Sequence, residues 1–523
     1  MQSRIIVLGA GHNGLVTAFY LARAGLRPLV LERRPIVGGV ATTEEIAGGV
    51  RGPALAHALG PLRHSIVRDM RLRERGVEFI EPDPALVALT PDGRHAAFHR
   101  DPVRTERSVG RLAARDAERY PAFAAALGRM GAVLRELLEM APPDVERPEL
   151  GDLWRLLSTA RRFRALPRQD AFRLLRWMPM AVADLVSEFF EHDTVQAAMA
   201  ARALTGTNLG PWSAATGALL LLHAAADPMP GGSGTTAVGG PGAVTRAMAE
   251  AAAEAGAEIR TGAAVARIET GAVGVEAVRL ESGEAIAASA VISNADPRRT
   301  FLELLDPTVL DPGFVTRVTH YRARGTTAKI NLVVSAIPRF SALGEDVSLL
   351  RGRLHIAPGI DYLERAFDAS KYGRCAESPW LDVAVPTVAD STFDTGKHVV
   401  SVIAHYAPFR LREGGWAGER EAFADRVVRV LDEYAPGFAA SVIARQVLTP
   451  QDLEDRFALT GGHIHHGEPS LDQMFFMRPV MGWARYATPV RGLYLCGGGT
   501  HPGLGLTGGS GQNAAREILR KLK

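Results

Sequence analysis

The most constraining feature of this sequence is the run IIVLGAGHNGLVTAFYLARAGLRPLVLE, which begins at Ile5 and ends at Glu32. Its four leading apolar residues, three of them β-branched, predict a buried parallel strand. Glycines then interrupt the apolar run, and residues 15–24 follow the spacing of a helix. The apolar residues after Gly25 predict a second strand that ends at the acid. This order of strand, glycine turn, helix, strand and acid predicts an α/β fold that binds a dinucleotide.

Each glycine of this segment has a physical role in a dinucleotide cradle. Gly9 permits the tight turn, Gly11 lets the backbone approach a pyrophosphate, and Gly14 lets the helix pack against the strand. The N-terminus of the following helix directs its amides and its dipole at the phosphates, and His12, in the glycine turn, is an expected cofactor contact. Glu32 follows Gly14 by 18 residues, a position from which an acid accepts hydrogen bonds from ribose hydroxyls. A glycine-rich turn without a ligand would explain the glycines but not the acid.

The chain is expected to return to the cofactor in VRGLYLCGGGTHPGLGLTGGSGQNAAREILRKL, near its end. The pattern predicts a short strand over residues 493–496, a glycine-rich loop over residues 497–511 and a helix from Gln512 onward. A strand, a glycine loop and a helix N-terminus suit a second contact with a large anionic ligand. A flexible linker is the alternative, but linkers rarely separate an apolar strand from an amphipathic helix. The expected contacts are Gly498, Gly499, Gly508 and Gly509.

A third segment fits the same domain. An Ala-rich helix is expected over residues 243–255, followed by two short strands, the second of which carries Val265. After a further strand pair with a turn at residues 282–283, the apolar run AVIS leads into Asn294, which is expected to lie near the cofactor. The predicted cofactor-binding domain is therefore assembled from residues 1–75, 230–300 and 481–523.

These blocks carry a resemblance to known flavoproteins. The continuation ERRPIVGGVATT is similar to the two-dinucleotide-binding-domain flavoproteins, in which an acid, a basic residue and a glycine pair accompany FAD. Over the whole chain, GGPGAVTRAMAEAA, VISNADP, TGGHIHHGEPSLDQMFFMRP and GLYLCGGGTHPG resemble the phytoene-desaturase-like flavoproteins. The resemblance is closer to the phytoene-dehydrogenase-related group that includes the pyridine nucleotide-disulfide oxidoreductase domain proteins. It implies bound FAD, with Arg33, Gly38 and Gly39 among the contacts.

The cysteines limit the redox chemistry that this resemblance allows. The only two, Cys375 and Cys496, form no CxxC pair, so no dithiol relay is expected. No second GxGxxG opens a βαβ unit, and no separate NAD(P)H domain is expected. The flavin is therefore expected to take electrons directly from a substrate and to pass them to an acceptor such as oxygen or a quinone.

The remaining residues, 76–229 and 301–480, are expected to form a substrate-binding domain with a mixed sheet and a helical cap. The first stretch is mainly helical in pattern. Between Arg155 and Arg176 it carries seven arginines against a single aspartate, with Trp, Phe and Leu interleaved. Two interpretations stay open: peripheral contact with an anionic membrane surface, and a solvated helical face in an arginine-rich chain.

Lys329 is a candidate catalytic residue because lysine is rare here: only five of the 60 basic residues are lysines. The run TTAKINLVVSAIP predicts a strand with Lys329 and Asn331 on one face and Ile330 and Leu332 on the other. A compact ammonium can hold a water or a carbonyl near a flavin, and its pKa falls readily on burial. Flavin amine oxidases, which resemble this fold, place a lysine near the flavin N5 through a water. A lysine on the strand surface is the alternative.

The histidines of GGHIHHG and GTHPG are the other polar candidates. His463 and His465 are expected to share a strand face, but no cysteine is spaced to complete a metal site, and Glu468 alone is too little. No metal is therefore expected, and a polar lining of the substrate cavity is favoured for this group, which includes His466. His501 stands beside the glycine loop and is the second candidate catalytic residue, with ordering of that loop as the alternative.

Composition excludes some partners. The formal net charge is only +3, so no overall basic balance argues for nucleic acid. The apolar run AATGALLLLHAAA is about 13 residues long, whereas crossing a bilayer takes roughly 20. The N-terminal MQSR leads straight into the first predicted strand and leaves no room for a signal peptide. The expectation is a cytoplasmic protein, with peripheral membrane contact left open.

Together these features predict an FAD-dependent oxidoreductase that removes two hydrogens from an apolar or amphiphilic small molecule. Such a desaturation needs hydride transfer to the flavin and proton loss to a nearby base or water. The pocket is expected to be long and apolar, with the helical region as its roof. The alternatives are a flavin amine oxidase that uses Lys329, a redox-neutral isomerase, and a non-catalytic FAD-bearing binding or regulatory protein. The oligomeric state stays open.

Overall fold

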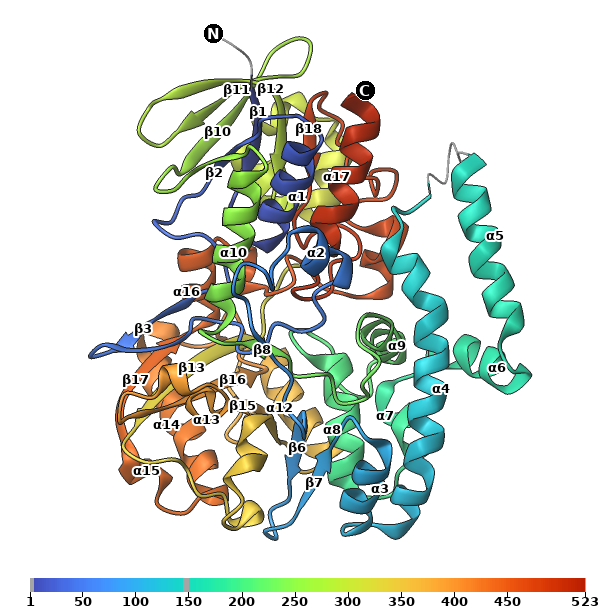
Figure 1. Ribbon diagram of the computed structural model, residues 1–523, viewed down its shortest axis with the longest axis vertical. Coiled ribbons are helices and arrows are strands. Elements are labelled where there is room, and N and C mark those ends of the chain that lie inside the picture. The colour runs from blue at the N-terminus through green and yellow to red at the C-terminus, as the bar shows by residue number, and fades with distance from the viewer. Residues whose placement is uncertain (1–3, 144–149, 523) are drawn as a thin grey trace.

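The computed structural model describes residues 4–143 and 150–522. Residues 1–3 and 523, at the two ends of the predicted cofactor domain, and residues 144–149 of the predicted helical cap lie outside the described residues. Two seven-stranded sheets and a group of helices make up most of the fold. In Figure 1 the first sheet lies at the top, the second at the lower left, and the helical region at the lower right.

The first sheet joins strands from three distant parts of the chain. Its order is β10-β11-β12-β1-β2-β9, and β18 pairs with β12. The strands are β1 (Arg4–Leu8), β2 (Leu29–Leu31), β9 (Glu258–Arg260), β10 (Val265–Thr270), β11 (Val275–Leu280), β12 (Ala285–Ser293) and β18 (Leu493–Leu495). The core strands run parallel, and β10, β11 and β12 pair antiparallel. The predicted α/β fold, built from separated segments, is confirmed.

Three helices pack beside this sheet: α1 (His12–Arg23), α10 (Pro241–Glu254) and α17 (Gly509–Leu522). Both α1 and α17 begin three residues earlier than the sequence pattern predicts. Glycine is a poor helix former, so the pattern hides a glycine-rich first turn. Packing offsets that weakness: a Cβ on Gly511 would lie 2.2 Å from the carbonyl oxygen of Asn13, so α17 and α1 meet backbone to backbone.

The second sheet is mixed, as expected, with the order β17-β13-β16-β15-β14-β6-β7. Its strands are β6 (Leu86–Leu89), β7 (His95–Phe98), β13 (Thr327–Val334), β14 (Arg353–Ile356), β15 (Leu381–Ala384), β16 (His398–His405) and β17 (Val442–Leu448). β6 and β7 lie within the stretch that is predicted to be mainly helical, and its pattern does not reveal them. Periodicity does not show whether a short apolar run forms a strand or a helix. The pairing of β6 with β14 makes this run a strand.

Strand β13 alternates as predicted, although all eight of its residues are buried. Ile330 and Leu332 join an apolar core with α14 (Trp416–Tyr434). The opposite face is covered by the hairpin of β3 (Thr43–Ala47) and β4 (Val50–Pro53). There the side-chain amide of Asn331 donates to the carbonyl of Pro53 at 3.0 Å. A hairpin from the N-terminal segment therefore covers the polar face that carries Lys329.

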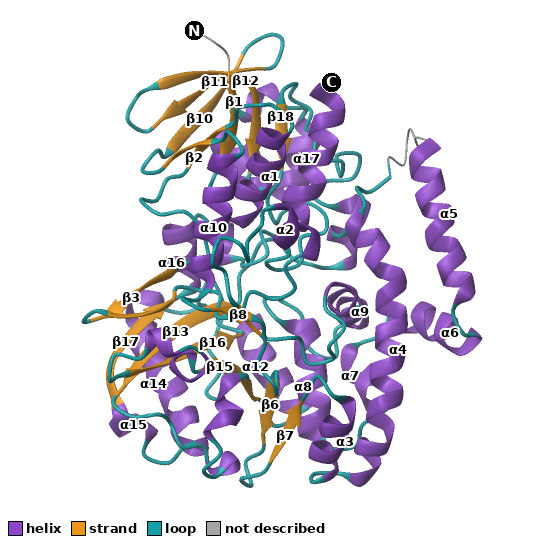
Figure 2. Ribbon diagram, in the orientation of Figure 1, coloured by secondary structure: helices purple, strands orange, loops and turns teal. Residues whose placement is uncertain are grey.

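The helical region is built around α4 (Ala114–Glu139) and a buried aromatic cluster that includes Phe123, Trp177 and Phe189. Its other helices are α3 (Pro102–Gly110), α5 (Leu150–Ala165), α6 (Arg168–Trp177), α7 (Val182–Ser187), α8 (Asp193–Leu204) and α9 (Thr216–Ala226). Figure 2 shows α5 and α6 at the outer edge of the molecule, beyond α4. No helix in the described ranges is long and apolar enough to span a bilayer.

Short elements complete the fold. These are α2 (His64–Asp69), α11 (Pro312–Thr319), α12 (Ile360–Lys371), α13 (Pro386–Ala389), α15 (Phe438–Ser441), α16 (Pro450–Phe457), and the strand pair β5 (Phe79–Ile80) and β8 (Thr236–Ala237). One π-helical segment, Arg299–Leu304, and 3₁₀ turns at Pro307–Val309, Ser341–Leu343, Val347–Arg351, Ser391–Phe393, Thr460–Gly462, Leu471–Gln473 and Phe475–Met477 join them.

Candidate functional site

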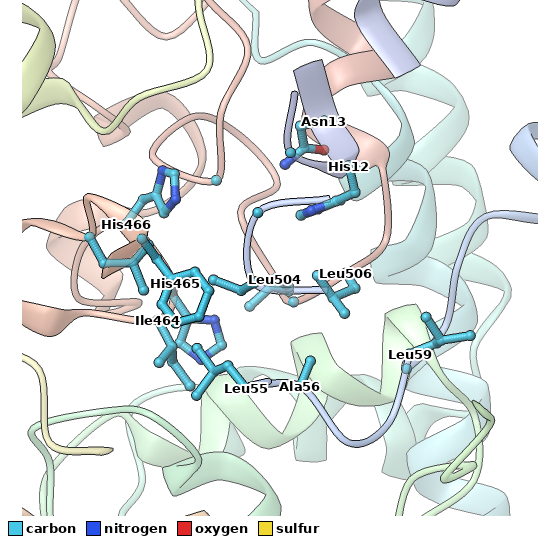
Figure 3. A pocket seen from close by; sticks show the side chains of 18 of the residues that line it. His12, Asn13, Leu55, Ala56, Leu59, Ile464, His465, His466, Leu504 and Leu506 are labelled. Carbon is cyan, nitrogen blue, oxygen red and sulfur yellow. The ribbon is translucent and has the colours of Figure 1, made fainter. Parts of the chain in front are cut away.

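One cavity of about 420 Å³ runs from the glycine turn after β1 to the strands of the second sheet. The segment 55–61, helices α8 and α9, and the segments 457–466 and 498–506 supply much of its wall. Figure 3 shows side chains from these separate segments converging on the open space. The candidate site therefore lies where the two sheets and the helical region meet.

The glycine turn has the geometry that its sequence predicts. Gly9 has a φ of +91°, a left-handed conformation that glycine adopts without strain. Its N–H donates to the carbonyl of Leu31 at 2.8 Å and ties the turn to β2. A Cβ on Gly14 would lie 2.1 Å from the carbonyl oxygen of Gly9, so the helix packs directly on the turn. Gly9, Gly11 and His12 line the cavity, and Gly14 lies beneath them.

Glu32 lies in the cavity wall at the end of β2 and is only 5% exposed. One carboxylate oxygen accepts the N–H of Ala10 at 2.7 Å, and the other accepts the N–H of Arg34 at 2.9 Å. These bonds fix the carboxylate beside the glycine turn, and its remaining lone pairs suit ribose hydroxyls. Arg33 also lines the cavity, and its guanidinium donates to the carbonyl of Asp455 at 2.6 Å.

The other predicted contacts from the first half of the chain reach the same wall. Gly38 and Gly39 line it, and the N–H of Gly38 donates to the carbonyl of Ala10 at 2.9 Å. Val265 and Asn294 line it as well, the latter held by a 2.9 Å bond from its N–H to the carbonyl of Leu8. Segments more than 200 residues apart in sequence are therefore brought together at one site.

The return loop after β18 contributes less than the sequence predicts. Gly498 lines the cavity, but Gly499, Gly508 and Gly509 do not. A Cβ on these three would lie 2.3 Å from Pro297, 2.5 Å from Ile66 and 2.8 Å from Arg63, respectively. Close packing within the protein therefore accounts for these three glycines. Leu504 and Leu506 take the neighbouring wall positions instead (Figure 3).

Two histidines in the wall have a buried ring nitrogen without a hydrogen-bond partner: Nε2 of His12 and Nδ1 of His466. They lie on opposite sides of the cavity in Figure 3. Burial, together with the other histidine, lowers the pKa of His12 to about 4. Burial and the Arg478 guanidinium lower the pKa of His466 to about 4. Both rings are therefore neutral and open to a polar ligand.

His466 was not among the predicted cofactor contacts. The sequence signal was the GGHIHHG block, but the predicted strand there is wrong: a 3₁₀ turn at Thr460–Gly462 precedes irregular backbone. His466 itself has a φ of +57°, a strained conformation for a residue other than glycine. His465 lines the cavity as predicted, whereas His463 lies behind it and faces Glu468 at 3.5 Å. Within the described part of the chain, no group of three His, Cys, Asp or Glu residues could hold a metal ion.

The end of the cavity farthest from the glycine turn is more polar than the apolar pocket that the sequence predicts. Ala198, Ala201 and Ile403 supply apolar wall, and α8 and α9 cover it, as the predicted helical roof would. Four charged side chains also line it: Arg202, Asp227, Arg353 and Asp382. Trp380 and His355 complete this wall, with the indole N–H donating to His355 Nδ1 at 3.2 Å.

Asp382 is the most unusual charge in this wall. Arg353 donates to its Oδ2 at 2.7 Å, but its Oδ1 is buried without a hydrogen-bond partner. Burial alone would raise the pKa of Asp382, but Arg353 and His57 outweigh it and hold that pKa well below its usual range. Nε2 of His57 lies 3.7 Å from this Oδ1, within ion-pair distance but too far for a hydrogen bond. The carboxylate is therefore ionised and only partly satisfied.

Neither candidate catalytic residue lies in the cavity wall. Lys329 is fully buried behind His57: its ammonium donates to Ser401 Oγ at 2.6 Å and lies 3.4 Å from His57 Nδ1. Burial lowers the pKa of Lys329 to about 7. His501 is buried against α4, where its Nε2 bonds the carbonyl of Leu137 at 2.8 Å. For His501, this favours the alternative of loop ordering.

The wall fits FAD by its chemistry. The N-terminus of α1 offers amides for a diphosphate, Glu32 offers a carboxylate for ribose hydroxyls, and the unpartnered ring nitrogens of His12 and His466 face the same space. Polar atoms buried without partners cost free energy, so their presence in a cavity points to a polar ligand.

Comparison with known proteins agrees with this geometry. Residues 14–519 match the family described as flavin containing amine oxidoreductase. The chain is 34% identical to the pyridine nucleotide-disulfide oxidoreductase domain-containing protein 2 of Rattus norvegicus, over 99% of this chain and 93% of that protein. It is 26% identical to the lycopene-forming phytoene desaturase of Pantoea ananas, over 99% of each chain.

The fold is also found among solved structures. Cyclohexylamine oxidase from Brevibacterium oxydans superposes with a TM-score of 0.58 at 16% identity, covering all of both chains. With the family match over nearly the whole chain, the FAD cofactor and oxidoreductase activity that the sequence predicts are confirmed. The chain belongs to the flavin-containing amine oxidoreductase family and is an FAD-dependent oxidoreductase.

Proposed function

We propose that this enzyme dehydrogenates an apolar or amphiphilic small molecule, forming a carbon–carbon double bond. The observation that carries the proposal is that one continuous cavity holds both the dinucleotide cradle and a chamber with a partly satisfied carboxylate, Asp382. The phytoene desaturase relative, whose name describes this chemistry, aligns with 99% of the chain. FAD, when bound, accepts the hydride that such a reaction releases.

The second product of the reaction is a proton, and the side chains of Asp382, His57 and Lys329 offer a path for it. Asp382 Oδ1 faces His57 Nε2 at 3.7 Å, and His57 Nδ1 faces the Lys329 ammonium nitrogen at 3.4 Å. Contacts of this length are common before a substrate closes the site. We propose that a proton leaving the substrate carbon passes from Asp382 through His57 to Lys329. The neutral amine of Lys329 takes up this proton and becomes an ammonium.

Lys329 suits the end of such a chain because its pKa, about 7, matches the working range of a proton acceptor. It is a positioning residue, since it acts through His57 and does not touch the cavity. A flavin amine oxidase would use the same residues for a different substrate. An isomerase would return the proton without net oxidation.

Anaerobic mixing with candidate substrates tests the function. Bleaching of the flavin together with a product two mass units lighter supports dehydrogenation of a hydrocarbon chain. Release of an amine or an aldehyde would support the amine oxidase instead. A product of unchanged mass would support the isomerase, and unchanged flavin with every substrate class would support a binding role.

We also propose that helices α5 and α6 touch an anionic membrane surface. Trp154, Leu157, Phe172 and Leu175 are 66%, 44%, 61% and 62% exposed on these helices. Arginines lie between them, including Arg161, Arg164 and Arg168. Exposed aromatic and leucine side chains among arginines suit a lipid interface. The side chain of Arg155, at the start of the predicted basic stretch, lies outside the described side chains.

The domain boundaries stay a proposal: residues 1–75, 230–300 and 481–523 for FAD, and residues 76–229 and 301–480 for the substrate. Strand membership supports this division, since all strands of the first sheet fall in the former set and all strands of the second fall in the latter. The β3–β4 hairpin crosses it, because it belongs to the first set by sequence but packs on β13, β16 and β17.

A further inference from the structure

A second cavity, of about 940 Å³, lies beside the FAD site, and we call it the arginine chamber. It is bounded by α2 and the turn that follows it, the C-terminal end of α4, residues 225–235, and α17 with the loop before it. Its wall shares with the first cavity the residues Gly60, Pro61, Ala226, Asp227, Ser233 and Leu504. The two spaces are therefore neighbours that share part of their lining, including the apolar residues Pro61, Ala226 and Leu504.

Arginines outnumber acids in this chamber. The lining includes Arg63, Arg68, Arg71, Arg73, Arg100, Arg135 and Arg516, against Glu74, Glu81, Glu139 and Asp227. Three of the arginines have acidic partners: Arg68 with Asp69 at 3.0 Å, Arg71 with Glu74 at 3.7 Å, and Arg100 with Glu81 at 2.9 Å. These pairs leave the chamber with an excess of positive charge.

The excess is concentrated where α4, α17 and the start of α2 meet. Within the described ranges, Arg63, Arg135 and Arg516 have no carboxylate within 4.0 Å. Arg135 donates to the carbonyl of Ala225 at 2.9 Å, a neutral partner. Arg516 lies close enough to Arg63 to lower that residue's pKa further. Arg63 thus has a like charge nearby and no carboxylate at ion-pair distance. Glu139, in the same wall, raises the pKa of Arg63 and offsets part of this repulsion from farther away.

Arg63 is the clearest case. Its guanidinium donates to Gln512 at 3.0 Å, Asn513 at 2.8 Å and the carbonyl of Leu138 at 2.6 Å, and all three acceptors are neutral. Burial lowers its pKa. A Cβ on Gly509 would lie 2.8 Å from its central carbon, so the cation packs on the first residue of α17. The positive end of that helix dipole adds to the charge rather than cancelling it.

A positive charge that is partly buried and lacks a counter-ion destabilises the protein unless an anion joins it. We propose that the arginine chamber binds the anionic head group, a carboxylate or a phosphate monoester, of an amphiphilic substrate whose apolar chain passes Pro61, Ala226 and Leu504 into the FAD cavity. The volume exceeds the needs of an inorganic anion and matches those of ligand pockets. This inference rests on the proposed function and assigns the polar end of its substrate.

The test measures binding to the FAD-loaded protein by calorimetry, without turnover. Four probes share one chain length: dodecanoate, dodecyl phosphate, dodecanol and dodecylammonium, each below its micelle concentration. The two anions should bind at least tenfold more tightly than the alcohol, and the cation most weakly. The ratio of the carboxylate to the phosphate affinity identifies the natural head group. Equal binding of acid and alcohol would overturn the proposal.

Variants locate the site within the chamber. Arg135→Met and Arg516→Met, both at exposed positions, should each weaken anion binding several-fold and leave dodecanol binding unchanged. Arg63→Met should weaken it most, and flavin content checks that α17 is intact. Arg100→Met is the matched control, because this arginine lines the same chamber but is already paired with Glu81. An equal loss in the control would place the effect outside Arg63, Arg135 and Arg516 and would contradict the proposal.

The outcome is separable from that of the proposed function. Selective anion binding with no flavin bleaching by any hydrocarbon chain would refute the dehydrogenase proposal and keep the anion site. Bleaching without any preference for anions would keep the dehydrogenase proposal and refute the anion site.

Discussion

The ammonium nitrogen of Lys329 lies 3.4 Å from Nδ1 of His57, and the pair is buried between β13 and the polypeptide that follows β4. His57 lines the cavity and Lys329 does not. The rare lysine of the sequence therefore reaches the site through a histidine, and this contact yields two predictions.

The first prediction concerns rate. If neutral Lys329 takes up the substrate proton, flavin reduction should speed up as pH rises through about 7, the pKa of this amine. Lys329→Met should keep FAD bound, abolish that pH dependence and slow reduction by about an order of magnitude or more. Lys329→Arg should not restore the rate, because guanidinium stays charged. Stopped-flow absorbance measures this, with exposed Lys371→Met as the control. Wild-type rates in both Lys329 variants would leave the lysine a structural role.

The second prediction concerns stability. Burial lowers the pKa of Lys329 from 10.5 to about 7, so between these values the unfolded chain binds more protons than the folded chain. Stability therefore rises with pH across this window, and the full cost of the buried ammonium is present below pH 7. Lys329→Met should raise the free energy of unfolding by a few kcal/mol near pH 6, and by much less near pH 10. Urea titrations at the two pH values check this; a gain independent of pH would contradict it.

The third prediction concerns the glycine turn. A Cβ on Gly11 would lie 2.9 Å from Nδ2 of Asn294, and both residues line the cavity that we propose holds FAD. Gly11→Val should therefore abolish FAD binding while the chain still folds. Acid release followed by mass spectrometry should find one FAD per wild-type chain and almost none in the variant. Gly128→Val is the control, since a Cβ there would meet no atom within 4 Å apart from the backbone of its own helix. Full flavin content in Gly11→Val would refute the role of this turn.

The fourth prediction concerns the unpartnered histidines. If His12 Nε2 and His466 Nδ1 bond FAD, replacing either ring by phenylalanine should weaken FAD binding roughly tenfold, the scale of one lost hydrogen bond. Fluorescence titration of apoprotein with FAD measures the affinity directly. His405→Phe provides the control. The His405 ring is also buried and without hydrogen-bond partners, but it does not line the cavity; it stacks on Trp380, which does. An unchanged affinity in both site variants would leave these rings without a cofactor role.

The fifth prediction concerns α5 and α6. Binding to vesicles that contain anionic lipid should weaken as salt rises, because ions screen the arginines. Replacing Trp154 and Phe172 by serine should weaken binding at every salt concentration, since both are well exposed. Sedimentation with anionic and neutral vesicles distinguishes the two effects. Equal sedimentation with both lipids, or none with either, would support the solvated-helix interpretation.

The sequence by itself determined the glycine turn and the acid that follows it. The turn at Gly9 and the acid at Glu32 are local signals, because a left-handed residue and a close helix–strand approach demand glycine whatever else the chain does. The alternation of β13 likewise assigned Lys329 and Asn331 to one face, as the structure has them. Such features depend on residues that are neighbours in the chain, so the amino-acid sequence alone is sufficient to predict them.

Only the tertiary structure decided which side chains meet. The GGHIHHG block does not reveal that His466 faces the cavity while His463 faces Glu468, because irregular backbone has no periodicity to read. His57 lies 272 residues from Lys329, and Arg63 lies 449 residues from Gln512. Packing of distant segments sets those contacts, their burial and hence their pKa values, and no local pattern encodes them.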